Sequence, residues 1–178
     1  LLMNRRPPRS TLLPDPTRYR SWTLDGRSGI NTTMRPIIVI PTRLASTRLP
    51  RKALADIGGV PMILRVVHRA LQSGLGTVVV AAGDQEILDA VSGIENVRGV
   101  LTESALASGS DRVHAALEQI DPQRDHDVVI NLQGDLPLID PTTLHNVLEP
   151  LKLPDFDIGT LAAPVMNIEE RDAASVVK

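Results

Sequence analysis

Residues 36–54 read PIIVIPTRLASTRLPRKAL, in which an apolar run leads directly into a basic loop. The run PIIVIP (36–41) is continuous and contains β-branched side chains, a pattern typical of a strand buried on both faces. The loop places four cationic side chains within ten residues: Arg43, Arg48, Arg51 and Lys52. In an open α/β sheet, ligands bind beyond the carboxyl ends of the strands, so this stretch predicts both a fold and the position of a site.

Apolar runs and amphipathic patterns alternate along the rest of the chain. Further strands are predicted at 77–82, 97–101, 127–132 and 158–164. Helices are predicted at 60–74, from Asp84, at 110–120, and from Asp140 to about Leu151, where Asp140 and Pro141 form an N-cap and first-turn signal. This alternation favours right-handed βαβ crossovers. We therefore expect an α/β fold with an open, mostly parallel sheet and helices on both faces.

The two ends of the chain differ from this pattern. Residues 1–35 contain seven arginines against two aspartates, with four prolines and no sustained apolar period. We expect residues 1–33 to be a disordered leader, or sequence upstream of a true start at Met34. Their composition also has a superficial likeness to an organelle transit peptide. The last residues, SVVK at 175–178, resemble the beginning of a strand, which predicts that the chain stops within a domain.

The composition argues against several classes of protein. A net charge of −2 provides no overall basic field for nucleic acid or membrane surfaces. The absence of cysteine excludes disulfides, thiolate metal sites and a cysteine nucleophile. Three aromatic residues are too few for a surface that stacks single-stranded nucleic acid, and no apolar run approaches the roughly 18 residues of a membrane span. We expect neither a nucleic-acid partner nor a membrane partner.

The basic loop is suited to a polyphosphate. Guanidinium groups bind phosphate oxygens in pairs, a lysine adds a point charge, and hydroxyls such as those of Thr42, Ser46 and Thr47 can donate further hydrogen bonds. The alternative is a solvated charged turn, but the buried strand that leads into the loop favours a binding site. The loop matches neither GxxxxGK(S/T) nor GxGxxG, the fingerprints of P-loop ATPases and dinucleotide-binding dehydrogenases.

The segment NLQGDLP (131–137) closes another strongly apolar strand. Asp135 in this position can hold Mg²⁺, which binds one or two carboxylates together with waters and substrate phosphates. Gly134 would allow a ligand to approach the backbone closely. The alternative is a turn in which a side chain bonds its own backbone before Pro137.

The segment SGSDR (108–112) opens a predicted helix, where free N–H groups could bind polar ligand groups. From the residues alone a structural interpretation is favoured, in which a serine caps the helix and Asp111 and Arg112 are surface charges. Asp84 follows a strand and could reach the same crevice, but capping of the next helix is its favoured role. The four histidines have no metal-ligand spacing.

Four motifs, taken in order, resemble one known family. They are PTRLASTRLPRKAL (41–54), DIGGVPMI (56–63), SGSDR (108–112) and NLQGDLP (131–137). They are similar to PARxASTRLPGKxLxxIxGxPMI, SGTER and NxQGDxP in the N-terminal half of the 3-deoxy-manno-octulosonate (Kdo) cytidylyltransferases, or CMP-Kdo synthetases. The resemblance runs from about Ile37 to Lys178, so residues 34–178 would be the N-terminal, nucleotide-binding part of a truncated cytidylyltransferase domain.

The resemblance implies the glycosyltransferase-A-like fold of nucleotide-diphospho-sugar transferases, and a reaction in which the anomeric hydroxyl of Kdo attacks the α-phosphate of CTP. It assigns the triphosphate to Arg43, Ser46, Thr47, Arg48 and Lys52, Mg²⁺ to Asp135, the neighbourhood of the sugar to Gln133, and cytosine and ribose to Ser108, Gly109 and Arg112. Arg43, Arg48, Lys52 and Gln133 would be the catalytic residues. The product feeds lipopolysaccharide biosynthesis, which implies a cytoplasmic enzyme that is a homodimer when full length.

Several positions depart from the family pattern, among them Thr42 at a usual alanine and the conservative changes of SGTER to SGSDR. Arg51 stands at a usual glycine, Gly83 where an aspartate is common, and Leu136 where many members have an acid. Family members also continue beyond Lys178, where a second Mg²⁺-binding aspartate, much of the Kdo pocket and the dimer-forming segment are expected. Two alternatives remain open. One is a cytidylyltransferase for another acidic sugar such as sialic acid, whose loop usually reads more like ARxGSKxxxxKN, and the other is a catalytically silent nucleotide-binding fragment.

Overall fold

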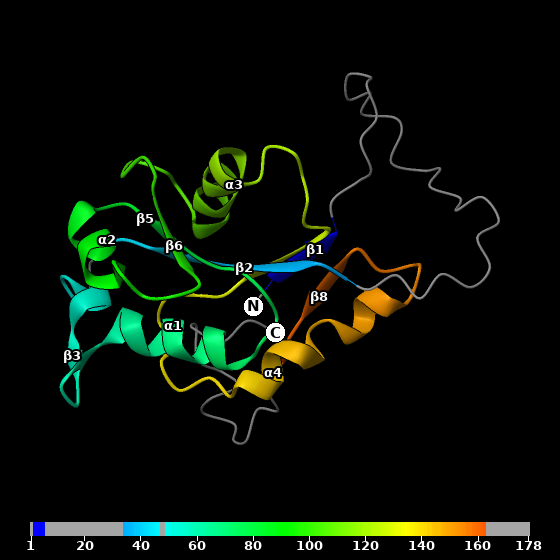
Figure 1. Ribbon diagram of the computed structural model, residues 1–178, viewed down its shortest axis with the longest axis horizontal. Helices are drawn as coiled ribbons and strands as arrows, with labels where there is room; N and C mark the ends of the chain where they lie inside the picture. Colours follow the sequence, from blue (N-terminus) through cyan, green and yellow to red (C-terminus); the bar gives the residue numbers. More distant parts are fainter. Residues whose placement is uncertain (1, 6–33, 47–48, 163–178) are drawn as a thin grey trace, which may run out of the picture.

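The structure of the protein is a computed structural model that describes residues 2–5, 34–46 and 49–162. The main sheet has six strands in the order β6-β5-β2-β7-β1-β8 (Figure 1). Four adjacent strands run parallel to one another: β6 (Val97–Leu101), β5 (Val78–Ala82), β2 (Pro36–Thr42) and β7 (Val128–Asn131). The predicted α/β fold with an open, mostly parallel sheet is confirmed.

The strand β2 lies at the centre of this parallel part. It pairs Ile38 with Val78 of β5 on one side and with Ile130 of β7 on the other. Residues 37–42 are all buried, as expected for a strand covered on both faces. Alternate side chains of a strand point to opposite faces, so Ile38 contributes to one hydrophobic core and Ile37 to the other.

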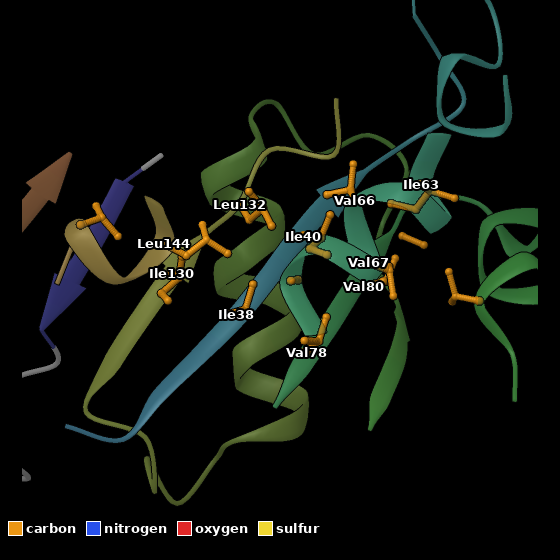
Figure 2. Close-up of a cluster of buried hydrophobic side chains, with 14 of the residues drawn as sticks. Ile38, Ile40, Ile63, Val66, Val67, Val78, Val80, Ile130, Leu132 and Leu144 are labelled. Atoms are coloured by element: carbon orange, nitrogen blue, oxygen red, sulfur yellow. The ribbon is translucent and has the colours of Figure 1, made fainter. Parts of the chain in front are cut away.

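Helices cover both faces of the sheet, as predicted. Those on one face are α1 (Met62–Gln72), α2 (Gln85–Val91) and α4 (Pro141–Asn146), and α3 (Gly109–Ile120) lies on the other (Figure 1). The larger core, drawn in Figure 2, joins Ile40 to Val66 of α1 and Leu144 of α4. The smaller core joins Val39 to Val113 of α3. Among the described residues, no helix is both long enough and apolar enough to cross a bilayer.

The helix predicted at 60–74 is shorter in the structure. Its first two residues form β4 (Val60–Pro61), which pairs with β3 (Asp56–Ile57) in a small hairpin. Gly58 and Gly59 connect these strands with φ angles of +59° and +81°, a region that glycine adopts readily. The hairpin therefore delays the start of α1 to the residue after Pro61.

The long helix predicted from Asp140 onward is split in two. Asp140 caps α4 as predicted, since its carboxylate accepts the N–H of Thr142 at 2.9 Å, and this bond lowers the pKa of Asp140. The helix α4 ends at Asn146, and the 3-10 helix η3 (Glu149–Lys152) follows. Pro150 explains the break, because it has no N–H for the carbonyl of Asn146 and its ring would collide with that carbonyl.

The prediction of a disordered leader over residues 1–33 does not hold for Leu2–Arg5, which forms β1. This strand lies between β7 and β8 (Ile158–Thr160) and is antiparallel to both. It thereby pairs with backbone groups of β7 that would otherwise form a free sheet edge. Residues 1 and 6–33 lie outside the described residues, as does everything after residue 162. The undescribed part includes the end of the strand predicted at 158–164 and the beginning of a strand predicted at 175–178.

Candidate functional site

A cavity of about 480 Å³ lies at the carboxyl ends of β2 and β7, beside the start of α3. All four of the sequence motifs supply residues to its walls, DIGGVPMI (56–63) through Met62. Predicted site residues in these walls are Arg43, Ser46 and Lys52 from the basic loop, Ser108, Gly109 and Arg112 from the start of α3, and Gln133 and Asp135 from the loop after β7. The remaining two predicted site residues, Thr47 and Arg48, lie outside the described residues. The fold therefore brings together side chains that are far apart in the sequence.

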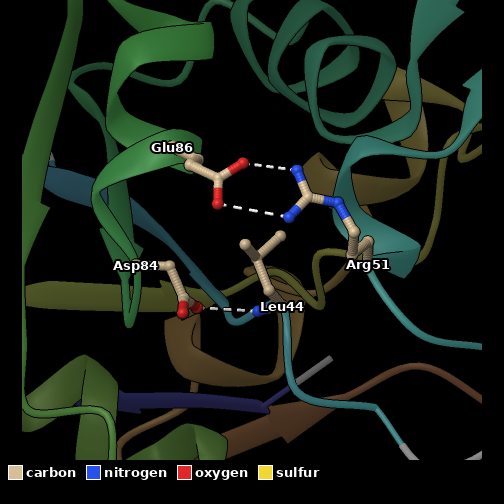
Figure 3. Close-up of polar contacts among 4 residues, drawn as sticks. All are labelled: Leu44, Arg51, Asp84 and Glu86. Atoms are coloured by element: carbon tan, nitrogen blue, oxygen red, sulfur yellow. Dashed lines mark hydrogen bonds and ion pairs between the residues drawn. The ribbon is translucent and has the colours of Figure 1, made fainter.

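The described cations of the basic loop, residues 43–52, lie on two sides of it. Arg43 and Lys52 line the cavity, and Lys52 Nζ donates to Asp135 Oδ2 at 2.7 Å. Arg51 points to the other side and forms an ion pair with Glu86 of α2 through both of its Nη atoms (Figure 3). This pairing raises the pKa of Arg51 and lowers the pKa of Glu86. Cations that are clustered in the sequence therefore do not all face the same cavity.

Arg51 has a left-handed backbone, with φ of +58°. It stands at the position where the family resemblance expects glycine. A residue with a Cβ is disfavoured in this region by roughly 1–2 kcal/mol. The left-handed residue immediately precedes the 3-10 helix η2 (Lys52–Leu54), so the turn at Arg51 sets the direction in which Lys52 leaves the loop.

Gly134 allows the loop after β7 to touch the end of β2. A Cβ on Gly134 would lie 3.0 Å from the carbonyl oxygen of Pro41 and 3.3 Å from the Cβ of Thr42. The contact brings Asp135 beside the basic loop, which explains how it reaches Lys52 across 83 residues of sequence. Gly134 also lines the cavity, so its expected role of letting a ligand approach the backbone stays a prediction.

Ser108 and Asp111 form a capping box at the start of α3. The N–H of Asp111 donates to Ser108 Oγ at 3.1 Å, and the N–H of Ser108 donates to Asp111 Oδ2 at 3.0 Å. The structural interpretation of these two residues is confirmed. Because Ser108 and Gly109 also line the cavity, the capped helix start forms a firm part of its wall.

Arg112 is buried, so its interpretation as a surface charge is wrong. The residue is 2% exposed, and it donates to Thr102 Oγ1 and to the Ser104 carbonyl oxygen, the latter at 3.4 Å. In the part of the chain that the structure describes, no carboxylate forms an ion pair with it. Burial and the charge of Arg43 lower the pKa of Arg112, and Asp84 acts in the opposite direction. A buried cation with spare N–H donors in a cavity wall is suited to bind a polar or anionic ligand group.

Gly83 makes room for this buried guanidinium. A Cβ on Gly83 would lie 2.9 Å from Arg112 Nη1 and 3.1 Å from Arg112 Cζ. The family resemblance expects an aspartate at this position. A side chain there would require Arg112 to move, so the departure at residue 83 and the position of Arg112 are linked.

Asp84 does not cap α2, contrary to our interpretation of the sequence. Its side chain makes no capping hydrogen bond, and its Oδ2 accepts the N–H of Leu44 in the basic loop at 2.7 Å (Figure 3). The position of Asp84 two residues after the end of β5 was the sequence signal for a role near the site. We found no comparable signal for Glu86, because its partner Arg51 lies 35 residues away.

One carboxylate of the cavity wall is available for a metal ion. Within the described ranges, no three His, Cys, Asp or Glu side chains gather closely enough to hold one. The side chain of Asp135 is 50% exposed, and Mg²⁺ needs only one or two carboxylates when waters and phosphates supply its other ligands. The residues therefore fit a Mg²⁺ that arrives with a polyphosphate rather than a complete protein cage.

Comparison with known proteins identifies the family of the chain. A family model described as Cytidylyltransferase matches residues 37–178. The 3-deoxy-manno-octulosonate cytidylyltransferase of Rhodospirillum centenum is 52% identical over 143 residues, which cover 80% of this chain and 55% of that protein. The corresponding protein of Paramagnetospirillum magneticum is 47% identical over 145 residues, covering 82% of this chain and 58% of the relative. The chain thus spans somewhat more than half the length of these curated relatives.

Solved structures show the same fold. A structure of CMP:2-keto-3-deoxy-manno-octonic acid synthetase complexed with CTP has a TM-score of 0.60 and 38% identity, over 66% of this chain and 47% of that chain. A nucleotidyl transferase from Methanothermobacter thermautotroptrophicus shares the fold at a TM-score of 0.56 and 23% identity, over 65% of this chain and 57% of that one. The sheet is that of the nucleotide-diphospho-sugar transferases. Since the family match contains the parallel strands and every motif that lines the cavity, the chain belongs to the cytidylyltransferase family.

Proposed function

We propose that the chain is the nucleotide-binding part of a Kdo cytidylyltransferase, which transfers CMP from CTP to Kdo. The observation that carries this proposal is the cavity at the carboxyl ends of β2 and β7, which Arg43 lines and in which Lys52 contacts the Asp135 carboxylate. The names of the relatives and the CTP in the similar synthetase support the two substrates. A role in lipopolysaccharide biosynthesis, a cytoplasmic location and a homodimeric full-length protein belong to the same proposal, which includes no nucleic-acid or membrane partner.

In the proposed reaction, the anomeric oxygen of Kdo gives up its proton and forms a bond to the α-phosphorus of CTP. The bond from that phosphorus to the oxygen bridging to the β-phosphate breaks, and pyrophosphate leaves with the bonding electrons. Reactions of this kind depend mainly on positioning and on neutralisation of charge. Arg43 and Lys52 would hold the triphosphate and neutralise the leaving group, and Ser46 would donate a hydrogen bond. Thr47 and Arg48 are assigned to the triphosphate from the sequence alone.

The wall formed by α3 would receive the nucleoside. Ser108 and Gly109 lie at the helix start, and Arg112 has N–H donors beyond those bonded to Thr102 and Ser104. We assign these three cavity residues to cytosine and ribose. Gln133 would lie near the sugar, and its amide is oriented by a 3.2 Å hydrogen bond from Nε2 to Asn131 Oδ1.

Asp135 would hold the Mg²⁺ that accompanies the triphosphate. When bound, Mg²⁺ would offset the negative charge that develops on the phosphate oxygens. In this structure the same carboxylate pairs with Lys52, and the two side chains are 50% and 39% exposed. We infer that Lys52 leaves Asp135 for a phosphate oxygen when the nucleotide binds, because the phosphates compete for the ammonium group while Mg²⁺ competes for the carboxylate.

Release of pyrophosphate tests this function. The chain, continued over the remaining length of its relatives, should release pyrophosphate from CTP only when Kdo and Mg²⁺ are both present. Equal release with sialic acid, or with no sugar, would contradict the assignment, and a preference for sialic acid would favour the alternative enzyme. The same assay on the 178-residue chain, combined with a CTP titration, distinguishes an active enzyme from a silent nucleotide-binding fragment.

A further inference from the structure

We propose that Asp84 and Glu86 are positioning residues, which hold the two ends of the basic loop so that its cavity-facing cations meet the nucleotide. The two carboxylates lie at the start of α2, and the cavity wall among the described residues includes neither of them. They act through Leu44 and Arg51, which both belong to the basic loop. The consequence for CTP rests on the proposed function, whereas the contacts with the loop do not.

Asp84 holds the first end of the loop. Its Oδ2 accepts the N–H of Leu44 at 2.7 Å in a part-buried contact, and Leu44 directly follows Arg43 of the cavity wall. A charged acceptor makes such a hydrogen bond stronger than a neutral one. Asp84 is itself well placed, because the N–H of Gly83 donates to the carbonyl of Thr42 at 3.0 Å and continues the pairing of β5 with β2.

Glu86 holds the second end of the loop. Its two carboxylate oxygens accept from the two Nη atoms of Arg51 (Figure 3), and a two-bond pair fixes orientation as well as distance. The next residue, Lys52, reaches into the cavity to Asp135. The N–H of Arg51 also donates to the carbonyl of Leu44 at 3.1 Å. The two ends are therefore tied to each other and to one helix start, and we expect these two ends to keep their positions together.

The stability of the fold does not account for an arginine at residue 51. The side chains of Arg51 and Glu86 are 56% and 55% exposed, and exposed ion pairs stabilise proteins little. The left-handed backbone of Arg51 favours glycine. We explain the arginine at residue 51 instead by its ion pair with Glu86, which fixes the direction of the loop.

Binding of CTP and CMP to the 178-residue chain tests the role of Glu86. Glu86→Gln should weaken CTP binding about three- to tenfold in a calorimetric titration, because misplaced binding groups lose affinity for the phosphates they were positioned to meet. Binding of CMP, which lacks the β- and γ-phosphates, should change by less than about twofold. Arg51→Met should have the same effect, and the double variant should lose no more than either single variant, because Glu86 acts through Arg51. Equal losses for CTP and CMP would indicate a general structural effect and would overturn the proposal.

Hydrogen exchange of the Leu44 amide tests the role of Asp84. Asp84→Ala should accelerate this exchange at least about tenfold without a matching loss of global stability, and it should weaken CTP binding more than CMP binding. Asp89→Ala removes an exposed carboxylate from the same helix and should change neither measurement. Unchanged exchange at Leu44 would overturn the role of Asp84. If Asp84→Ala does not fold, the surface variant Glu86→Gln decides the proposal.

The outcomes separate this inference from the proposed function. An unsubstituted chain that does not bind CTP would contradict the proposed nucleotide site, and with it a positioning role toward CTP. An unsubstituted chain that binds CTP, with affinity unchanged in Asp84→Ala and Glu86→Gln, would contradict the positioning role alone.

Discussion

Arg51 and Lys52 are consecutive cations of one loop, yet they extend to opposite sides of it. Lys52 reaches Asp135 in the cavity at 2.7 Å, whereas Arg51 forms its ion pair with Glu86 of α2. The left-handed backbone at Arg51 separates the two directions. The comparison shows that a run of like charges in a sequence does not define a single binding site, because one cation can face a ligand while its neighbour holds the loop.

The two ion pairs are similarly exposed to solvent, but they differ in whether a bound ligand could compete for their partners. All four side chains are between 39% and 56% exposed, so neither pair stabilises the fold strongly. The Lys52–Asp135 pair lies in the cavity, where a polyphosphate and a metal ion could each take one partner. The Arg51–Glu86 pair lies at the start of α2. We therefore expect a nucleotide to break the first pair and to leave the second in place.

The largest effect is expected when the carboxylate of the cavity pair is removed. Asp135→Ala, in the chain continued over the full length of its relatives, should abolish Mg²⁺-dependent release of pyrophosphate, because Asp135 is the one acidic residue that the structure places in the cavity wall. Glu86→Gln should retain the dependence on Mg²⁺. Circular dichroism should show an unchanged fold for both variants. Turnover that survives Asp135→Ala would rule out a metal role for this residue.

A smaller difference is expected between the two cations themselves. Lys52→Met should weaken CTP binding roughly ten- to a hundredfold, since it removes a charged donor from a phosphate. Arg51→Met should weaken it less than about tenfold, because it acts only through the position of the loop. Both affinities should be measured by titration at one salt concentration, because screening changes them. Losses of the same size would indicate that Arg51 also contacts the nucleotide.

The smallest effect is expected on stability, when Arg51 is replaced by glycine. Arg51→Gly removes the ion pair, but it also relieves the left-handed backbone, whose cost for a residue with a Cβ is roughly 1–2 kcal/mol. The two effects oppose each other, so the free energy of unfolding in urea should change little at pH 7. Arg51 lowers the pKa of Glu86 from its ordinary value of 4.5. The pair therefore contributes fully above about pH 4.5, and its contribution is lost as the pH falls through the lower folded-state value.

The sign of the stability difference should consequently change with pH. In acid the unsubstituted chain no longer has the charged pair, while the relief of the backbone remains, so Arg51→Gly should be the more stable of the two. Urea unfolding at pH 7 and at a pH below the folded-state pKa of Glu86 measures this difference. A glycine variant that is less stable at both pH values would show that the arginine stabilises the fold by another contact.

Much of the fold could be predicted because a strand buried on both faces needs a continuous apolar run. The predicted strands that lead to β2, β5, β6 and β7 agree with the structure to within about one residue at each end. The break between α4 and η3 was missed because the N-cap signal at Asp140 predicted one long helix, and the helix-breaking effect of Pro150 was not considered. The strand β1 was missed because its pairing partners, β7 and β8, lie far along the chain and its own composition is typical of a leader.

By itself, the sequence determined the α/β architecture and the gathering of Arg43, Lys52 and Asp135 at one edge of the sheet, because the carboxyl ends of parallel strands meet there. The tertiary structure alone decided which charges face the cavity and which hold the scaffold. Asp84 bonds a loop residue 40 positions away, and Glu86 pairs with one 35 positions away. Arg112 is buried by neighbours from other elements. The partner and burial of a charged side chain depend on backbone direction and on what lies across from it in space, and a local stretch of sequence contains neither.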